Sequence, residues 1–588
     1  MNYLAVDTLL GAQRATGRRS SIQLAVRVAH EVAIRFGHLR SIMARNSAHI
    51  GSTRSSESKS GSLRVSVSWL GLYFQQTVIG GFRLAATMAG RASWREIGDV
   101  IRELYLADDA PWVIGYSGGK DSTAALQLVW YSISELPSKE RNRKTIHVIS
   151  TDTLVEQPLV AASVARSLRL MSEAAGQQGI PVQPNRLTPK LENAFWVNLI
   201  GKGYCAPRPT FRWCTSRLKI EPSNRFITEV VRRHGEAILV LGSRKAESAK
   251  RAANLARYEK KRTRQWLSPN ASLPSSWVFT PIENWTNDDV WVYLMQNDNP
   301  WGCSNKDLLT LYRGATADND CPLVVDTSTP SCGGSRFGCW VCTVVTADKS
   351  MAAMIRNDDE KAWMAPMLDF RNELGQLDEY GRIGDWAERD YRRLSGSITL
   401  HQRDGRPVHG PYTKQRREYL LRRILQISEQ ITASRPKEMA DWQLITLAEL
   451  AAIRRLWVVE KSEFDDALPR IYGEVTGREY PKNERLIPGA LGESEWNLLA
   501  HLAGDDYVYL DLLSSLLCAE QRAYQLGRRR GILDELEGHI ERCYYSGEDD
   551  AAEFETRRQS LRALTGEQLE LSFWEQPSQV AGPAGDER

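Results

Sequence analysis

The fold of this chain is decided by residues 112–122, which read Trp112-Val-Ile-Gly-Tyr-Ser-Gly-Gly-Lys-Asp-Ser122. The apolar start is typical of a buried strand, and the segment from Ser122 to Ser134 has the pattern of a helix. Glycines between a strand and a helix let backbone N–H groups close around a phosphate, which the helix N-terminus also attracts. An ordinary tight turn is the alternative, although it does not need the lysine, aspartate and serines present here. We therefore expect a phosphate-binding loop.

Strand and helix patterns continue to alternate after this stretch. The sequence predicts strands over residues 146–150 and 237–241 and a helix over roughly 158–175. Such alternation is typical of a parallel sheet with helices on both faces, whose ligands bind at the carboxyl ends of the strands. The predicted fold class is therefore α/β, a doubly wound, Rossmann-like parallel sheet, followed by a mainly helical C-terminal region.

The chain of 588 residues is long enough for about three to five domains. Residues 1–90 are rich in Arg and Ser and contain eleven Lys or Arg, which indicates a disordered or transit-like extension, or translated sequence upstream of a start at Met88. We expect the nucleotide-binding domain over 91–300, a cysteine-rich insert over 301–350 and a helical domain over 351–588.

The composition excludes several classes of protein. Hydrophobic residues make up 42% and charged residues 25% of the chain, values typical of globular proteins, and no apolar run reaches the roughly 18 residues of a spanning helix. The nearest run, 69–78, is interrupted by two glutamines, which indicates a soluble segment or an interfacial helix rather than a spanning one, and no membrane partner is expected. Nine cysteines without a secretory signal pattern favour reduced thiols in the cytoplasm. The net charge of +4 does not by itself indicate nucleic-acid binding.

The glycine loop is not a Walker A motif, because Lys120 is followed by Asp121 rather than by Ser or Thr. It resembles the pyrophosphate loop of the ATP pyrophosphatase superfamily, whose adenine nucleotide alpha hydrolase-like domains cleave ATP between the α and β phosphates. The resemblance implies that Lys120 neutralises phosphate charge and that Asp121 orders the loop or its Mg²⁺. The residues implied in binding ATP and Mg²⁺ here are Ser117, Gly118, Gly119, Lys120, Asp121 and Ser122.

Four residues outside the loop complete the predicted nucleotide site. Asp152 follows the second predicted strand and, by analogy with the superfamily, would contact the adenosine end, unless it only caps a helix. Gly242 and Arg244 follow the third strand, and Arg251 comes seven residues later. A guanidinium presents paired donors to phosphate oxygens. A solvated helix face is the alternative, and it is the stronger rival for Arg251.

Three further segments narrow the resemblance to PAPS-reductase-type proteins: 212–215, 242–244 and 281–286. Sulfonucleotide reductases of that type carry a C-terminal Glu-Cys-Gly-x-His motif and an altered loop, whereas this sequence has an intact loop and lacks the motif. The chain most resembles the DndC family of DNA phosphorothioation proteins, including Tyr105-Leu106 and 111–116 before the loop. That family replaces a non-bridging oxygen of the DNA backbone with sulfur.

The resemblance implies an ATP pyrophosphatase-type sulfurtransferase that acts on DNA. Its implied partners are DNA, a cysteine desulfurase as sulfur donor, and other subunits of the phosphorothioation (Dnd) complex. Three alternatives remain open: a sulfonucleotide reductase, a tRNA thiolase, and a non-catalytic subunit that binds ATP and DNA within a modification complex.

Four cysteines with the spacing C-x10-C-x6-C-x2-C form a candidate metal site: Cys321, Cys332, Cys339 and Cys342. Four thiolates on one short segment can hold a [4Fe–4S] cluster or a structural zinc ion. Zinc ribbons usually show two C-x2-C pairs, and only one occurs here. The family resemblance favours [4Fe–4S], with zinc and simple core packing as alternatives.

Cys205 and Cys214 lie outside this cluster, beside Arg208, Arg212 and Arg217. Because neighbouring cations lower the pKa of a thiol, we expect either cysteine to form a thiolate that carries a persulfide or attacks an activated phosphate. A small buried residue is the alternative for each.

A basic stretch from Arg244 to Arg264 contains nine Lys or Arg against two Glu, a local excess of +7. Such a stripe can follow a phosphate backbone, and Tyr258 and Trp266 are available for stacking on bases. The sequence therefore predicts DNA contacts here, with a charged, solvated helix as the alternative.

Overall fold

The computed structural model describes residues 94–262, 264–315, 338–378, 383–401, 405–481, 493–504, 506–526, 530–543, 545 and 547–565. The predicted extension over residues 1–90 and the apolar run 69–78 lie outside these ranges.

The first unit of the fold is a six-stranded sheet in the order β3-β2-β1-β4-β6-β5. All neighbouring strands run parallel except β5, which is antiparallel to β6 at one edge. The predicted α/β class with a mostly parallel sheet is therefore confirmed. The strands are β1 (Trp112–Gly115), β2 (Ile146–Thr151), β3 (Val182–Leu187), β4 (Ala237–Val240), β5 (Ser268–Pro269) and β6 (Ser276–Phe279).

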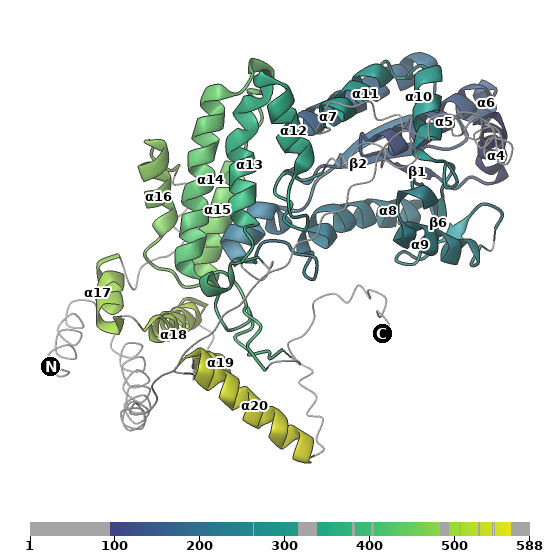
Figure 1. The fold of residues 1–588 in the computed structure, drawn as a ribbon. Coiled ribbons are helices and arrows are strands. Elements are labelled where there is room, and N and C mark those ends of the chain that lie inside the picture. The colour runs from purple at the N-terminus through teal and green to yellow at the C-terminus, as the bar shows by residue number, and fades with distance from the viewer. Residues whose placement is uncertain are drawn as a thin grey trace, which may run out of the picture.

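Helices cover both faces of this sheet, and alternate residues of the strands face them. Trp112 and Ile114 belong to the core that includes side chains of α5 (Lys120–Ser134) and α7 (Pro158–Gln178), whereas Val113 packs on α8 (Glu221–His234). Figure 1 shows α7 and α8 on opposite sides of the strands. Both sets of side chains are buried, which explains the continuous apolar run of β1.

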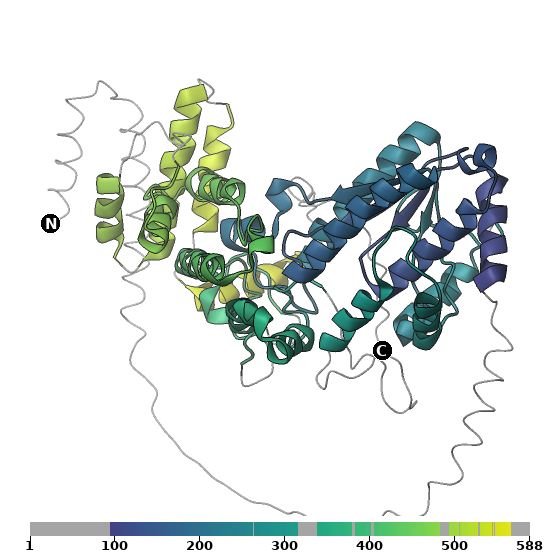
Figure 2. The same ribbon diagram turned by 90° about the horizontal axis from the view of Figure 1, so that it is seen from above.

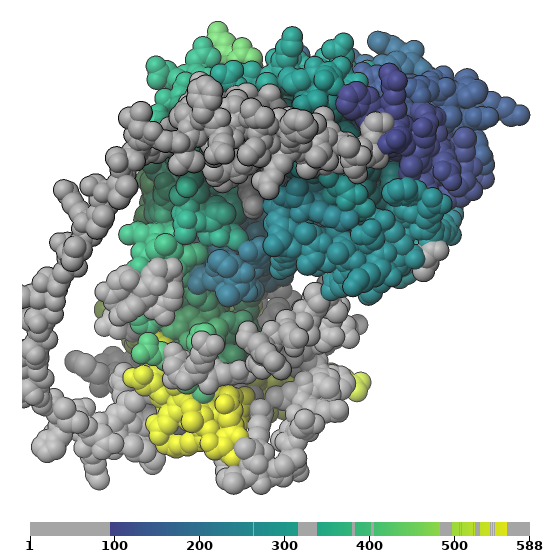
Figure 3. Space-filling model, turned by 45° about the vertical axis from the view of Figure 1, so that its right-hand side comes forward, coloured from purple at the N-terminus to yellow at the C-terminus, as the bar shows by residue number. Residues whose placement is uncertain are grey.

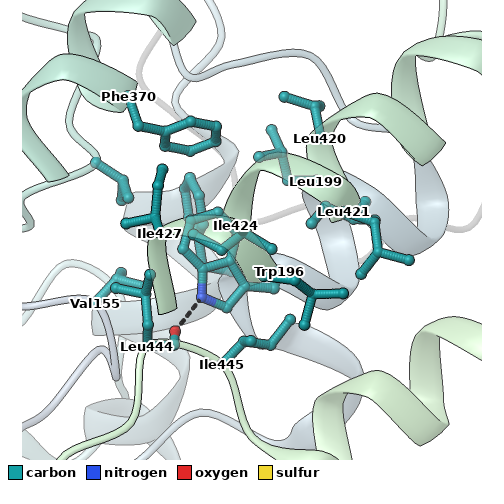
Figure 4. Close-up of a cluster of buried hydrophobic side chains, with 14 of the residues drawn as sticks. Val155, Trp196, Leu199, Phe370, Leu420, Leu421, Ile424, Ile427, Leu444 and Ile445 are labelled. Atoms are coloured by element: carbon teal, nitrogen blue, oxygen red, sulfur yellow. Dashed lines mark hydrogen bonds between the residues drawn. The ribbon is translucent and has the colours of Figure 1, made fainter. Parts of the chain in front are cut away.

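A second core joins the helical region to a segment of the first half of the chain. Apolar side chains from residues 194–218, which the sequence grouped with the nucleotide domain, pack with residues 340–374 and 412–480. Trp196 lies in the middle of this core and donates its indole N–H to the carbonyl of Leu444 at 2.8 Å (Figure 4). The main helices are α12 (Lys349–Asn357), α13 (Ala365–Leu374), α14 (Lys414–Ser434), α15 (Leu447–Arg455) and α16 (Ala467–Thr476).

The two units lie side by side (Figures 2 and 3). The remaining helices of the sheet unit are α4 (Trp94–Ala107), α6 (Ser138–Arg141), α9 (Ala249–Glu259), α10 (Asn287–Gln296) and α11 (Asn305–Gly314). The last helices are α17 (Glu493–Ala503), α18 (Tyr507–Leu526), α19 (Ile532–Arg542) and α20 (Glu548–Thr565). In the part of the chain that the structure describes, none of the helices is long and apolar enough to cross a membrane.

The strand order creates one switch point, beside β1. The chain moves from β1 to β2 and β3 on one side and then returns to β4 on the other side. Loops that leave such a point in opposite directions open a crevice at the carboxyl ends of the strands. Here the loop after β4 lies against the first turn of α5, because a Cβ atom on Gly242 would come within 2.6 Å of the carbonyl oxygen of Asp121. Only glycine fits this contact without movement of the backbone.

We expect Gly242→Ala to destabilise the protein by about 2 kcal/mol, since the added methyl group meets backbone rather than a flexible side chain. Gly176→Ala is the matched control, because Gly176 lies within α7 with nothing near its Cβ position. That substitution should stabilise the protein slightly, by about 0.5 to 1 kcal/mol. Urea unfolding of both variants measures the difference, and equal stability would contradict the packing described here.

Candidate functional site

The glycine loop connects the end of β1 to the N-terminus of α5. Gly118 has a φ of +73°, in the left-handed region, and a side chain there would lie 2.5 Å from a methyl carbon of Val164. The hydroxyl of Ser122 closes the loop, since it donates to the carbonyl of Gly119 at 3.0 Å and accepts from the N–H of Ser117 at 3.2 Å. Gly119 is the N-cap of α5 and offers the first turn no side-chain acceptor. The loop is therefore built to present N–H groups to an anion.

Asp121 is held between two cations. One carboxylate oxygen lies 3.3 Å from the Nζ of Lys120, and the other accepts from the Nε of Arg244 at 2.7 Å. Arg244 is only 4% exposed, and its guanidinium also reaches the carbonyl of Trp285. The sequence assigned Arg244 to phosphate recognition, but its nearest partner is the carboxylate of Asp121. Arg244 and Gly242 thus fix the first turn of α5 from the neighbouring strand.

The other two predicted nucleotide residues have surface partners. Asp152 accepts from the N–H of Leu154 at 2.8 Å and from the Nε of Arg186 at 3.0 Å. It does not cap α7, whose N-cap is Gln157. Arg251 is 52% exposed and is paired with Glu247 one helical turn before it.

The cysteine knuckle formed by residues 339–342 docks on the loop that follows β2. The N–H of Trp340 donates to the carbonyl of Val155 at 3.0 Å, and the N–H of Gln157 donates to the carbonyl of Gly338 at 3.2 Å. Since β2 neighbours β1, the knuckle lies at the same edge of the sheet as the glycine loop. Of the four cysteines predicted to bind metal, Cys321 and Cys332 lie outside the described residues.

The side chain of Cys339 lies among polar groups. Its sulfur is 3.3 Å from the hydroxyl of Thr153 and 3.8 Å from a carboxylate oxygen of Glu156, which pairs with the Nζ of Lys219 at 3.2 Å. Burial raises the pKa of the Cys339 thiol. Desolvation alone would lower the pKa of Lys219, but the negative charge available at Cys339 and Glu156 raises it. Lys219 thus stays protonated and can balance negative charge at this site.

Cys214 belongs to the same region. Burial raises the pKa of its thiol, and the charge of Cys342 adds to that rise. The structure therefore brings Cys214 into the region of Cys339 and Cys342, which lie more than 120 residues later in the sequence. Among the described residues no three His, Cys, Asp or Glu side chains converge closely enough to hold a single metal ion.

The prediction that nearby arginines lower the pKa of Cys205 and Cys214 is wrong, because burial raises the pKa of both thiols and, at Cys205, outweighs the nearby cations. Cys205 is buried in the second core. The guanidinium of Arg208 is paired with Asp385 at 2.7 Å, and that of Arg217 donates to Asn193 at 2.9 Å. Cations with partners of their own favour a thiolate less than the sequence suggested.

Sequence reasoning missed Arg371, which lies on α13 and is 1% exposed. Its guanidinium donates twice to the carbonyl of Cys342, at 2.9 and 3.0 Å, and also to the carbonyls of Val345 and Thr346. The helical region thereby fixes the chain directly after the knuckle. An arginine within a helix face of buried apolar residues was the available signal.

The basic stretch after β4 is largely neutralised. Five of its nine cations have acidic partners: Arg244, Lys245, Arg251, Arg262 and Arg264. Lys250, Lys260 and Lys261 have no acidic partner within the described ranges. The remaining cation, Arg257, lies over the ring of Tyr258. The positive charge that this segment can offer to a polyanion is therefore smaller than the local excess of +7 counted from the sequence.

The sheet and the knuckle lie within a stretch of sequence that is similar to a known protein family. Residues 111–344 match the model of the phosphoadenosine phosphosulfate (PAPS) reductase domain. The chain is thus similar to that domain over these residues. It is also 27% identical over 201 residues to an uncharacterised protein of Methanocaldococcus jannaschii, which covers 34% of this chain and 35% of the relative. The chain thus matches only about a third of the length of that relative.

Two solved structures are similar to parts of this chain. One is PAPS reductase from Candida auris in a phosphate complex, with 15% identity and a TM-score of 0.22 over 40% of this chain and 89% of that one. The other is the U34-tRNA thiolase NcsA from Methanococcus maripaludis with its [4Fe-4S] cluster, with 14% identity and a TM-score of 0.23 over 36% of this chain and 70% of that one.

We expect Arg371→Met to lower the free energy of unfolding by about 3 kcal/mol, because three buried carbonyls lose a charged donor. The change should also make Cys342 react faster with a thiol reagent. Arg422→Met removes a half-exposed partner of Glu474 and should cost no more than about 1 kcal/mol. Urea unfolding and mass spectrometry of alkylated peptides test both; a similar small effect for the two variants would contradict the role of Arg371.

Proposed function

We propose that the chain is an ATP pyrophosphatase-type sulfurtransferase that incorporates sulfur into the DNA backbone in the cytoplasm. One observation carries this proposal: the glycine loop after β1 and the cysteine knuckle on the loop after β2 occupy the same edge of one sheet. In this proposal the glycine loop is the activating site, the knuckle belongs to the sulfur-handling site, and both act on one substrate.

The first step activates a DNA phosphate. A non-bridging oxygen attacks the α phosphorus of Mg²⁺-bound ATP, a new P–O bond forms, and the bond to the β phosphate breaks to release pyrophosphate. The N–H groups of the loop and the ammonium of Lys120 stabilise the charge on the departing pyrophosphate. Asp121, held by Arg244, keeps this first turn in place. The adenylated oxygen can now leave the DNA phosphorus as part of AMP. An unactivated phosphate oxygen is a poor leaving group.

The second step delivers sulfur. A cysteine desulfurase supplies a persulfide to Cys214, and its terminal sulfur attacks the activated phosphorus while AMP departs. A second thiol then attacks the sulfur–sulfur bond, which frees the phosphorothioate and leaves a disulfide, so the two electrons come from protein thiols. The protonated side chain of Lys219 stabilises the anionic groups beside Cys339.

The thiols near this edge suit a [4Fe–4S] cluster by their chemistry, since thiolates are its usual ligands. Cys339 and Cys342 share the knuckle, and Cys321 and Cys332 complete the candidate set of four. Such a cluster, when bound, supplies electron transfer or an attachment point for sulfur. A zinc ion held by the same residues would instead make the knuckle structural.

DNA would approach along the segment that carries the exposed lysines Lys250, Lys260 and Lys261, and Trp266 of the same segment is also exposed. Phosphate contacts of this kind position nucleic acid without reading its sequence. Selection of the DNA target then falls to the other subunits of a phosphorothioation complex.

A sulfonucleotide reductase is the second candidate, favoured by the match of residues 111–344 to the PAPS reductase domain. It predicts sulfite from an adenylyl sulfate and a reductant, with no pyrophosphate. A tRNA thiolase would release pyrophosphate with tRNA in place of DNA. A non-catalytic subunit would bind ATP without turnover.

Lys120→Ala should reduce pyrophosphate release from ATP by about 100-fold or more in the presence of Mg²⁺, DNA and a persulfide donor, because the loop loses its positive charge. Lys139→Ala, on exposed α6, is the control and should keep wild-type turnover. The same assay with tRNA in place of DNA distinguishes a DNA-modifying enzyme from a tRNA thiolase, because only the true substrate supports pyrophosphate release. Wild-type pyrophosphate release by Lys120→Ala would refute the assignment of the loop.

Cys339→Ser should remove most of the iron and sulfide from chain purified under anaerobic conditions, since it takes away one thiolate of the knuckle. Cys303→Ser should leave both unchanged, because Cys303 lies against Ser167, apart from the knuckle. Metal and sulfide analysis with an absorption spectrum makes the measurement. A colourless wild-type protein with one zinc ion would contradict the cluster.

A further inference from the structure

The turn at residues 208–211 presents an aromatic ring to solvent. Arg208 and Phe211 exchange two backbone hydrogen bonds, at 3.2 and 2.9 Å, which close the turn. The guanidinium of Arg208 donates to both carboxylate oxygens of Asp385, at 2.7 and 3.0 Å, and so ties the turn to the helical region. Phe211 stands at the end of this fixed turn and is 41% exposed. The ring is therefore held at the surface by a well-anchored backbone.

The turn lies against the cysteine knuckle. The carbonyl of Pro207, just before the turn, accepts from the hydroxyl of Thr343, and Thr343 directly follows Cys342. Phe211 itself precedes Cys214 by three residues. The exposed ring thus belongs to the same part of the molecule as the thiols to which the proposed function assigns sulfur delivery.

Phe211 is the outermost of a row of aromatic rings. Its centroid is 6.3 Å from that of Tyr204, and the two rings are tilted by 56°. Tyr204 packs edge-on against Trp213, which is 5% exposed and stacks on the buried ring of Phe195. Because Tyr204 does not lie flat on the ring of Phe211, that ring can still take a planar group on its face.

The segment around this ring is positively charged. Residues 202–220 contain five Lys or Arg and no Asp or Glu. Arg212 is exposed, and within the described ranges it has no acidic partner. Arg217 donates to two neutral oxygens, the side-chain carbonyl of Asn193 at 2.9 Å and the hydroxyl of Tyr204 at 2.8 Å. The charges of these two arginines are therefore not cancelled by a carboxylate among the described residues.

An exposed aromatic ring beside such cations is the combination with which proteins bind single-stranded nucleic acid, since the ring stacks on a base and the cations contact phosphates. An acidic peptide would satisfy the cations but would bring no base to the ring. A base within a duplex is covered by its neighbours, so a base that stacks on a protein side chain has to leave the duplex stack.

We propose that Phe211 is a base-stacking residue, whose ring binds an unpaired base of the DNA next to the phosphate that receives sulfur, while Arg212 contacts the backbone. The inference rests on the proposed function, because it requires DNA at the thiols. It adds to that function a substrate in which at least one base is unstacked when the chain binds it.

Phe211→Ala tests the proposal, because it removes the ring and keeps the backbone turn. For a single-stranded thymidine oligonucleotide of about 12 nucleotides, we expect the Kd to rise about 5- to 100-fold, the range for one lost stacked base. A fully abasic strand of the same length keeps the phosphates, so its Kd should change by less than about twofold. Fluorescence anisotropy on the full chain at one salt concentration measures both.

Three variants complete the experiment. Phe211→Tyr keeps an aromatic face and should bind the oligonucleotide as the wild type does. Arg212→Ala should lower the slope of log Kd against log salt by about 0.7, the share of one phosphate contact on a single strand. Phe554→Ala is the matched control, since Phe554 of α20 is 42% exposed, and it should leave both Kd values unchanged.

The outcomes separate this inference from the proposed function. If the wild-type chain binds no DNA, both fail. If it binds DNA and releases pyrophosphate with it, but Phe211→Ala binds the oligonucleotide equally well, only the role of Phe211 is refuted. The expected loss of affinity without DNA-dependent pyrophosphate release would refute the proposed function and support the stacking contact.

Two further results would overturn the stacking contact. An equal loss of affinity for the base-bearing and the abasic strand would show that the ring supports the fold or the phosphate contacts. An unchanged Kd for the oligonucleotide with weaker binding of the persulfide donor would assign Phe211 to a protein partner. Should Phe211→Ala unfold, Phe211→Leu against Phe211→Tyr gives the same comparison, with tighter oligonucleotide binding expected for the aromatic variant.

Discussion

The contact between the loop after β4 and the first turn of α5 is the constraint on which the site depends. Gly242 lets the two backbones approach, and the ion pair between Arg244 and Asp121 holds them there in a buried position. Because the phosphate-binding N–H groups belong to the same turn, their directions are set by this contact. The glycine loop is thus positioned from two strands that leave the switch point in opposite directions.

The thiols are positioned by a second set of contacts that crosses between the two units. The knuckle at 339–342 pairs with the loop after β2, while Arg371 of the helical unit binds the carbonyl of Cys342. Cys214 arrives on a segment whose apolar side chains pack in the helical core. The helical region therefore works as the support for the cysteines, and the sheet works as the support for the nucleotide loop. Neither unit alone would present both groups.

The sequence predicts correctly those elements whose structure depends on residues close together in the chain. The strand, loop and helix around residues 112–134 were predictable because apolar period, glycine and helix start all lie in one stretch. β3 was missed because it is a polar edge strand that contains Pro184. Arg371 acts across a separation of 25 to 29 residues in the sequence, which no local pattern records. The thiol pKa values were predicted in the wrong direction because burial is a property of the packed core, invisible beside a run of arginines.

The central claim is that the glycine loop and the thiols act on the same DNA phosphate. It is tested most directly by the ratio of the two products, AMP and DNA phosphorothioate. Chain purified anaerobically is mixed with ATP, Mg²⁺, DNA and a persulfide donor, and AMP and DNA phosphorothioate are quantified in the same reaction by mass spectrometry. One AMP for each sulfur incorporated is the predicted result. Phosphorothioate without AMP, or steady AMP formation with no sulfur in the DNA, would show that the loop and the thiols do not act on a common substrate.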